Sequence, residues 1–257
     1  MARKGSVETR YGPGKYAAFH LLLGVWIRRY VRNGSCVYVT LGGTELRDIQ
    51  SLIFINQALA SSIYSFEIAA DRFQLACESR DKLLKIGIKV ECVPTSIFEY
   101  KRASNERHLF FLDLEGIYDL EYARDFELLF KSNTLREGDG LLVTSHLGHN
   151  PGYIKTVFRW FEREFQWLNI TDTEEKRELY RVAHPSFVLY RALEQADLID
   201  TLSLTCFGSV QYFDTSSMGL YGYAIGAGQT QFRNFIADTS ARAFSIPTVR
   251  RPTAATR

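Results

Sequence analysis

The sequence predicts an α/β protein with a doubly wound, mostly parallel sheet that is closed near its end by an antiparallel hairpin. Two observations predict this fold class. Strand-like runs alternate with segments of helical periodicity as far as residue 145, which is typical of a parallel sheet with helices on both faces. Two β-rich runs near the end of the chain are separated by the turn-like residues Asp214-Thr215-Ser216-Ser217, which indicates an antiparallel pair.

The expected elements can be followed in chain order, and each strand is a short apolar run bounded by turn residues. We expect a first helix over 15–32, stopped by Asn33-Gly34. The expected strands of the parallel part are 36–41, 62–68, 88–93, 108–113 and 141–145. The expected helices are 45–60, 70–85, 119–132, 151–167 and 173–195, and the β-rich runs of the hairpin are 198–210 and 218–225.

The length of 257 residues suits one large α/β domain with an appendage or two small domains, and a composition that is 46% hydrophobic is sufficient for a sizeable core. We expect a polar N-terminal arm over 1–14, a domain over 15–230 with a helical insert at about 151–195, and a C-terminal tail over 231–257. Basic residues gather in the arm and the tail, where a solvated chain end is the ordinary interpretation and contact with phosphates is the alternative. The formal net charge of +2 leaves nucleic acid open as a partner.

The cysteines are widely scattered, with no C-x-x-C motif, and no secretory signal precedes the first helix. The apolar run 17–27 is too short to span a bilayer. His146 and His149 lack a third ligand at metal-binding spacing. We therefore expect a soluble cytoplasmic protein with no membrane partner and no metal, whose oligomeric state the sequence does not specify.

The segment Cys36–Leu46 predicts a ligand-binding turn, because a buried strand runs into two glycines and then a helix. Gly42 and Gly43 let the backbone approach a ligand, and the start of the next helix offers free N–H groups. A pair of glycines after a strand is common, so this turn needs support from other strands.

Three other expected strands end in residues that suit a nucleotide-type ligand. Glu67 ends the second, where a carboxylate accepts both hydroxyls of a ribose. Ser96 and Ile97 follow the third, where they could flank an adenine. Asp113 ends the fourth, over the same rim of the sheet. Each has an ordinary alternative: a solvated acid for Glu67, a plain turn at Ser96, and a helix cap for Asp113.

This ordered set resembles the class I S-adenosylmethionine-dependent methyltransferases, which have a Rossmann-like fold. The resemblance implies that Leu41, Gly42, Gly43 and Thr44 lie under the methionine part of that cofactor. It also implies that Glu67, with Ile68, holds the ribose, that Ser96 and Ile97 flank the adenine, and that Asp113 lies near the reacting methyl group. Asp113 is thus the expected catalytic residue, which would orient the acceptor or take its proton. The family's sheet also closes with an antiparallel hairpin.

The sequence departs from the family pattern at three positions. Thr40 stands where the family commonly has an acid, and Thr44 and Leu46 replace glycines. Residues 113–116 replace the signature of enzymes that methylate base amino groups, which disfavours that reaction. A fainter likeness, at 15–26 and in the hairpin, is to the three-Cys-motif partner group of methyltransferase-like proteins.

Three functions are compatible with these residues. The first is S-adenosylmethionine-dependent methyl transfer to an acceptor that the sequence does not identify. The second is a catalytically inactive methyltransferase-fold module for binding or assembly, with nucleic acid as one candidate partner. The third is a nucleotide-dependent oxidoreductase, which ranks last because it requires a fuller glycine pattern and leaves the hairpin unexplained.

Overall fold

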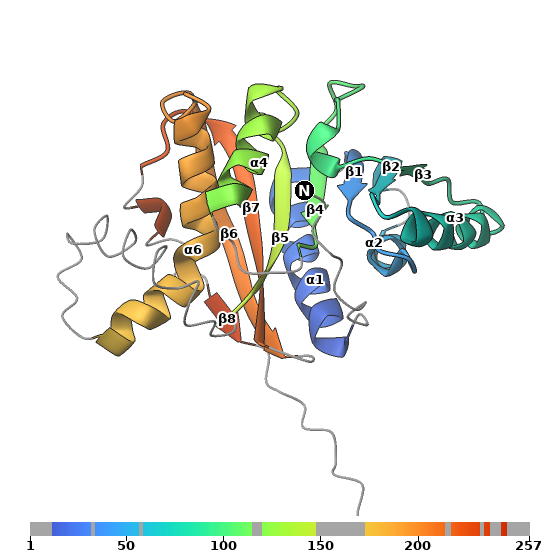
Figure 1. Cartoon of the computed structure of the whole chain (residues 1–257), viewed down its shortest axis with the longest axis horizontal. Helices are drawn as coiled ribbons and strands as arrows, with labels where there is room; N and C mark the ends of the chain where they lie inside the picture. Colours follow the sequence, from blue (N-terminus) through green and yellow to red (C-terminus); the bar gives the residue numbers. More distant parts are fainter. Residues whose placement is uncertain are drawn as a thin grey trace, which may run out of the picture.

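The structure is a computed structural model that describes residues 12–31, 34–56, 59–114, 120–147, 173–213, 217–231, 234–236 and 243–245. Within these residues one eight-stranded sheet has the order β3-β2-β1-β4-β5-β7-β6-β8 (Figure 1). The strands are β1 (Cys36–Thr40), β2 (Ala60–Phe66), β3 (Glu91–Val93), β4 (His108–Leu112), β5 (Gly140–His146), β6 (Leu202–Phe213), β7 (Ser217–Ala227) and β8 (Ala243–Ser245). The helices are α1 (Pro13–Trp26), α2 (Arg47–Ile55), α3 (Ala70–Leu84), α4 (Leu120–Lys131) and α6 (Thr173–Gln195), with a π-helical turn η1 (Ile27–Val31) and a 3₁₀ turn η2 (Ile97–Glu99).

The strand directions confirm the predicted fold class. The strands from β3 to β5 pair in parallel, whereas β7 pairs antiparallel with both β5 and β6. The two central strands β1 and β4 are buried along their whole length, as expected for parallel strands covered on both faces.

Each face of the sheet carries its own hydrophobic core. Alternate side chains of one strand point to opposite faces, so Tyr38 belongs to one core and Val39 to the other. The core around Tyr38 contains the buried side chains of α1 and α2, and the core around Val39 contains those of α4 and α6. The molecule is therefore a three-layer α/β/α arrangement, with α3 beside β3 at one edge and α6 near β6 at the other (Figure 1).

The first helix crosses one face of the sheet and is fitted to it at a glycine. A Cβ atom on Gly140, the first residue of β5, would lie 2.2 Å from Nε1 of Trp26. Trp26 is fully buried at the end of α1, so the absence of a side chain at Gly140 lets the indole lie directly on the strand. The helix begins at Pro13, a residue favoured at the first helical position because its missing N–H needs no partner there.

The structure changes several expected boundaries. The third strand covers only Glu91–Val93, not 88–93. Residues 243–245, which we expected in the C-terminal tail, form β8 and pair in parallel with β6. The expected helix 151–167 lies outside the described residues, whereas 173–195 is helical as expected. None of the described helices is both long enough and apolar enough to cross a bilayer.

Candidate functional site

Three predicted site segments share one rim because β2, β1 and β4 are neighbours and run in the same direction. Thr40, the last residue of β1, is level with Ser65 of β2 and Phe111 of β4. The turn after β1, Glu67 after β2 and Asp113 after β4 therefore emerge side by side. This is the end of the sheet at which open α/β folds bind ligands.

The glycine turn is shaped by packing within the chain. A Cβ atom on Gly42 would lie 2.7 Å from Ser65 Oγ and 2.9 Å from Leu46 Cδ2, so a larger residue does not fit without a shift. Gly43 has a φ of 57° and open space where a Cβ would be, so its backbone is accessible. Thr44 is buried, and its carbonyl accepts a hydrogen bond of 2.7 Å from Ser79 Oγ of α3. The turn is therefore held in place without the further glycines of the family pattern.

Asp48 is a site residue that the sequence analysis missed. It lies in the first turn of α2, and its side chain is buried beneath the glycine turn. Its Oδ2 accepts hydrogen bonds from Tyr38 Oη at 2.8 Å and from Thr40 Oγ1 at 2.7 Å. A carboxyl group from the next helix thus lies beside Thr40. The signal in the sequence was the pair of hydroxyls at Tyr38 and Thr40, alternate positions of a buried strand, because buried hydroxyls need a hydrogen-bond acceptor nearby.

The environment of Asp48 opposes ionisation. Burial raises the pKa of this carboxyl, and the charge of Asp113 raises it further, while the hydrogen bonds from Thr40 and Tyr38 lower it. Oδ1 of Asp48 has no hydrogen-bond partner among the described residues. It lies 3.5 Å from the place that a Cβ atom on Gly42 would take. A buried polar atom therefore lies directly under the turn that we expect to hold a ligand.

Asp113 makes interactions through both of its carboxylate oxygens. Oδ1 accepts a hydrogen bond of 2.8 Å from Thr144 Oγ1 of β5, and Oδ2 pairs with the ammonium of Lys15. Lys15 comes from the first turn of α1, and the pair is largely shielded, with 10% of the Lys15 side chain and 22% of the Asp113 side chain exposed. The sequence analysis did not assign Lys15 to the site, because nothing local marks a contact across 98 positions.

Glu67 and Ile68 lie at the rim in the expected order. Oε1 of Glu67 accepts a hydrogen bond of 3.0 Å from the Ala69 N–H, at the start of α3. Its second oxygen, Oε2, has no hydrogen-bond partner in the described part of the chain. Ile68 is 64% exposed, so it presents apolar surface next to Glu67. The pair thus presents a carboxylate oxygen beside an apolar surface, as a ribose with an attached base requires.

Ser96 and Ile97 fit the adenine-binding expectation less well. Ser96 Oγ accepts a hydrogen bond of 3.3 Å from the Phe98 N–H and caps the 3₁₀ turn η2. Ile97 is 1% exposed and packs in the core, so its side chain does not present a surface to the rim. The expectation for Ile97 is therefore corrected, because an apolar residue after a short strand here fills the layer beneath the rim.

A buried serine–histidine pair lies beside Thr144 and was also missed. Ser145 Oγ and His184 Nε2 are 2.9 Å apart, and these residues are 0% and 2% exposed. The pair joins the end of β5 to α6, and its burial favours a packing role. His146 is half-buried at the end of β5, and His149 lies outside the described residues.

No family model and no curated protein matches the chain. Solved structures with a similar arrangement include an S-adenosylmethionine-dependent methyltransferase from Clostridium acetobutylicum, at 11% identity and a TM-score of 0.48, covering 82% of this chain and 92% of that one. A second is the N-methyltransferase NodS from Bradyrhizobium japonicum in complex with S-adenosyl-L-homocysteine, at 12% identity, a TM-score of 0.44 and coverages of 85% and 89%.

A third similar structure is geranyl diphosphate methyltransferase in complex with SAM, at 12% identity and a TM-score of 0.46, covering 82% of this chain and 85% of that one. All three are methyltransferases, the class that the sequence resembles. Because these sequence identities and TM-scores are low, we assign the fold from the strand order of this chain and the candidate site from its own residues.

Proposed function

We propose that this chain binds S-adenosylmethionine at the carboxyl ends of β1, β2 and β4 and transfers its methyl group to an acceptor. The observation that carries the proposal is the shared rim, where Gly43, Glu67 and Asp113 emerge from three adjacent parallel strands. The antiparallel hairpin of β6 and β7 agrees with the resemblance drawn from the sequence.

The residues at this rim suit such a cofactor. The accessible backbone of Gly43 would meet its methionine part, while Oε2 of Glu67 would accept hydrogen bonds from the ribose. The exposed side chain of Ile68 would cover one face of the base. Oδ1 of Asp48 gives the site a buried polar atom under the turn. When bound, S-adenosylmethionine supplies an activated methyl group on a cationic sulfur.

Asp113 is the residue proposed to meet the acceptor. Thr144 and Lys15 fix the orientation of its carboxylate, and the ammonium of Lys15 balances its charge. A carboxylate held in this way can orient a hydroxyl or amine and take its proton as the new bond forms. Methyl transfer depends mainly on alignment of the two reactants, so one positioned carboxylate is sufficient.

A second function, a binding or assembly module without catalysis, is favoured by one observation. Both oxygens of Asp113 already have partners within the chain, so the carboxylate is satisfied without an acceptor. This alternative predicts a folded protein that binds neither S-adenosylmethionine nor S-adenosylhomocysteine.

Replacing Glu67 with Ala is expected to weaken the binding of S-adenosylmethionine at least tenfold. The variant loses hydrogen bonds between a carboxylate and the ribose hydroxyls, and bonds to a charged group contribute about 1.5–3 kcal/mol each. Isothermal titration of wild type and variant with S-adenosylmethionine and S-adenosylhomocysteine measures the change. Mass spectrometry of the purified protein detects a cofactor that remains bound.

The matched control for this experiment is Glu91→Ala, because Glu91 is an exposed acid on the neighbouring strand β3. It should bind the cofactor as the wild type does. Thermal unfolding of both variants separates lost affinity from the lost hydrogen bond to Ala69. Wild-type affinity in Glu67→Ala contradicts the ribose role, and a folded wild type that binds neither compound contradicts the proposed function as a whole.

A further inference from the structure

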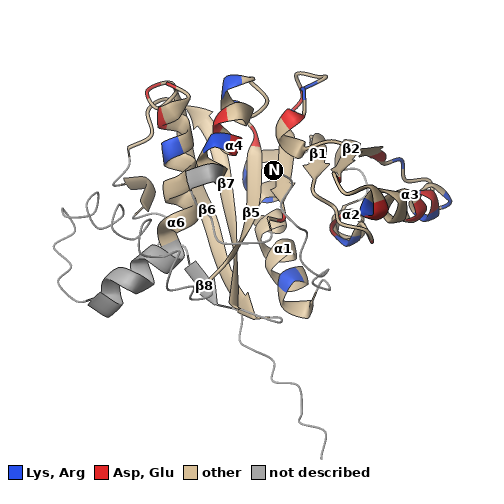
Figure 2. Ribbon diagram, viewed as in Figure 1, with Lys and Arg blue, Asp and Glu red and all other residues tan. Residues whose placement is uncertain are grey.

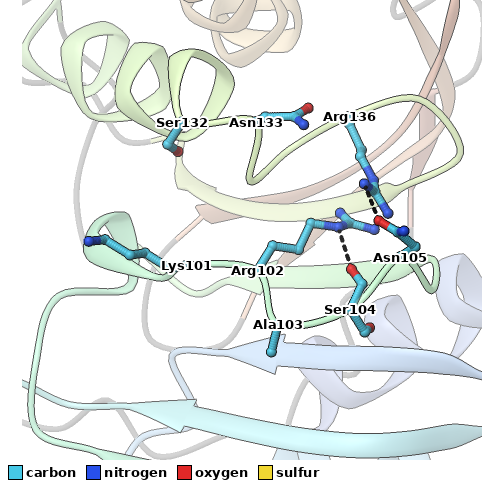
Figure 3. Close-up of a pocket in the computed structure, with 8 residues that line it drawn as sticks. All are labelled: Lys101, Arg102, Ala103, Ser104, Asn105, Ser132, Asn133 and Arg136. Carbon is cyan, nitrogen blue, oxygen red and sulfur yellow. Dashed lines mark hydrogen bonds between the residues drawn. The ribbon is translucent and has the colours of Figure 1, made fainter.

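Two open cavities lie at the amino-terminal end of the sheet, opposite the rim that holds the glycine turn. The first, of about 480 Å³, lies between residues 101–105, which precede β4, and residues 132–136, which precede β5 (Figure 3). The second, of about 560 Å³, is lined by residues 29–31, 34–35 and Arg107, next to the starts of β1 and β4. Neither cavity is part of the proposed cofactor site.

The residues that line these cavities include five cations and no acid. The cations are Arg29, Lys101, Arg102, Arg107 and Arg136. The chain as a whole has nearly equal numbers of cations and acids, with 31 Lys and Arg against 29 Asp and Glu. The lining of the two cavities is therefore locally enriched in positive charge. On α3, by contrast, acidic and basic residues are mixed (Figure 2). We call these five residues the amino-edge cations.

Arg102 has a structural role among them. Its side chain is only 8% exposed, and it pairs with the buried carboxylate of Asp139. It also donates hydrogen bonds to the carbonyls of Thr134, at 3.0 Å, and Ser104, at 3.1 Å. These contacts join the segments on the two sides of the first cavity. The charge of Arg102 is therefore neutralised, and its contribution is to hold the cavity open in a fixed shape.

The other four amino-edge cations have no acidic partner among the described residues. Arg136 donates a hydrogen bond of 3.0 Å to Asn105 Oδ1, which orients its guanidinium across the first cavity (Figure 3). Lys101 is exposed and points to the opposite side from the guanidinium of Arg102 (Figure 3). Arg29 is exposed beside the second cavity.

Arg107 lines the second cavity and also lies close to the segment that leads into β5. It donates a hydrogen bond to the carbonyl of Tyr30, which lines the second cavity. Its Nε lies 3.6 Å from the place that a Cβ atom on Gly138 would take, and Gly138 follows Arg136 of the first cavity by two residues. Since β1, β4 and β5 are neighbours about 4.8 Å apart, the four cations extend across roughly 10 Å of the sheet edge. Two acids near this edge, Glu106 and Glu137, line neither cavity.

We propose that the four amino-edge cations other than Arg102 bind the phosphate backbone of a nucleic acid strand. Cations spread over two open cavities at one edge of the sheet suit a chain of phosphates better than a single phosphate, which requires donors that converge on one point. Tyr30 is the one aromatic residue that lines either cavity, so the contacts go to phosphates and are independent of base sequence. This proposal does not depend on cofactor binding at the opposite end of the sheet.

The test is fluorescence anisotropy with a fluorescein-labelled oligothymidylate of about 20 nucleotides, a length that covers one such site. The variant combines Arg29→Glu, Lys101→Glu and Arg136→Glu. We expect its affinity to fall at least tenfold at low salt. The slope of log Kd against log salt should also fall by about 2, since each lost contact with a single strand accounts for about 0.7.

The matched control combines Lys82→Glu, Lys85→Glu and Lys89→Glu, three exposed lysines at the end of α3 and just after it, with the same change in net charge. Its affinity should stay within threefold of the wild type. An equal loss in both variants would show a non-specific charge effect and overturn the proposal. So would a wild type that does not bind the oligonucleotide.

Two further measurements complete the test. If the triple variant does not fold, Lys101→Ala replaces it, because the side chain of Lys101 makes no ion pair with a described residue. Its salt slope should fall by about 0.7. Wild-type protein is also tested with millimolar inorganic phosphate and with vesicles of phosphatidylserine and phosphatidylcholine. Binding to either of these without binding to the oligonucleotide assigns the cations to another anion and overturns the proposal.

Discussion

Replacing Lys15 with Met is expected to lower the free energy of unfolding by about 2–4 kcal/mol. The variant leaves the carboxylate of Asp113 with Thr144 as its remaining described partner. Breaking a buried ion pair by removing one partner costs about 3–5 kcal/mol, and the 22% exposure of the Asp113 side chain reduces this somewhat. Urea unfolding of the two proteins at pH 7 measures the difference.

Two further variants separate this pair from a general effect of removing a lysine. Lys131→Met breaks the exposed pair between Lys131 and Glu127, and it should cost no more than about 0.5 kcal/mol. Adding Asp113→Asn to Lys15→Met removes the unpaired charge and should restore part of the lost stability. Equal losses for Lys15→Met and Lys131→Met, or no recovery in the double variant, would show that the Lys15–Asp113 contact contributes little.

Replacing Asp48 with Ala is also expected to cost about 2–4 kcal/mol. The hydroxyls of Tyr38 and Thr40 both donate to its Oδ2, and Ala leaves them without that acceptor in a buried place. Each unsatisfied buried group costs about 1–3 kcal/mol. Asn keeps an acceptor oxygen in the same shape, so Asp48→Asn should retain most of the stability that Asp48→Ala loses. A similar loss in both variants would contradict the role of these two hydrogen bonds.

The same carboxyl predicts a pH dependence with a definite sign. Burial raises the pKa of Asp48, so the folded protein keeps this proton at pH values where the unfolded chain has lost it. Stability from this group is therefore complete below about pH 4, near the pKa of an exposed Asp, and falls as the pH rises towards the pKa in the folded state.

Asp48→Asn removes this dependence, so its unfolding free energy relative to wild type should increase as the pH rises above about 4. The difference between the two proteins is measured by urea unfolding over a pH series. Burial also raises the pKa of Asp139, and subtracting the two curves removes that contribution because both proteins contain Asp139. A flat difference curve would contradict the shifted pKa of Asp48.

The succession of strands and helices along the chain and the shared rim could be predicted because each depends on a local pattern. Apolar runs such as Cys36–Thr40 have the composition of buried parallel strands, and the residue after each run lies at the rim by geometry. The start of α2 was placed two residues early because Leu46 adopts a φ of 49°. A left-handed conformation is uncommon in a residue other than glycine, so the sequence gives no warning of it.

The partners of the site acids could not be predicted in the same way. Lys15 and Asp113 are 98 positions apart, and their contact depends on how α1 lies across the finished sheet. An acid in the first turn of a helix, such as Asp48, is usually explained by its favourable interaction with the helix dipole. The sequence therefore did not indicate that the side chain of Asp48 points into the protein. The strand β8 has only three residues, Ala243–Ser245, too few for a periodic signal.

The position of α1 has a structural consequence. Lys15, near its first residue, is paired to Asp113 at the carboxyl rim, while Trp26, its last residue, rests on Gly140 at the other end of the sheet. The helix of 14 residues is about 21 Å long and continues directly into η1, which carries Arg29. One helix therefore extends from the proposed methyl-transfer rim to the segment that carries an amino-edge cation. The Lys15–Asp113 contact and Arg29 therefore belong to one continuous helical segment, although they lie at opposite ends of the sheet.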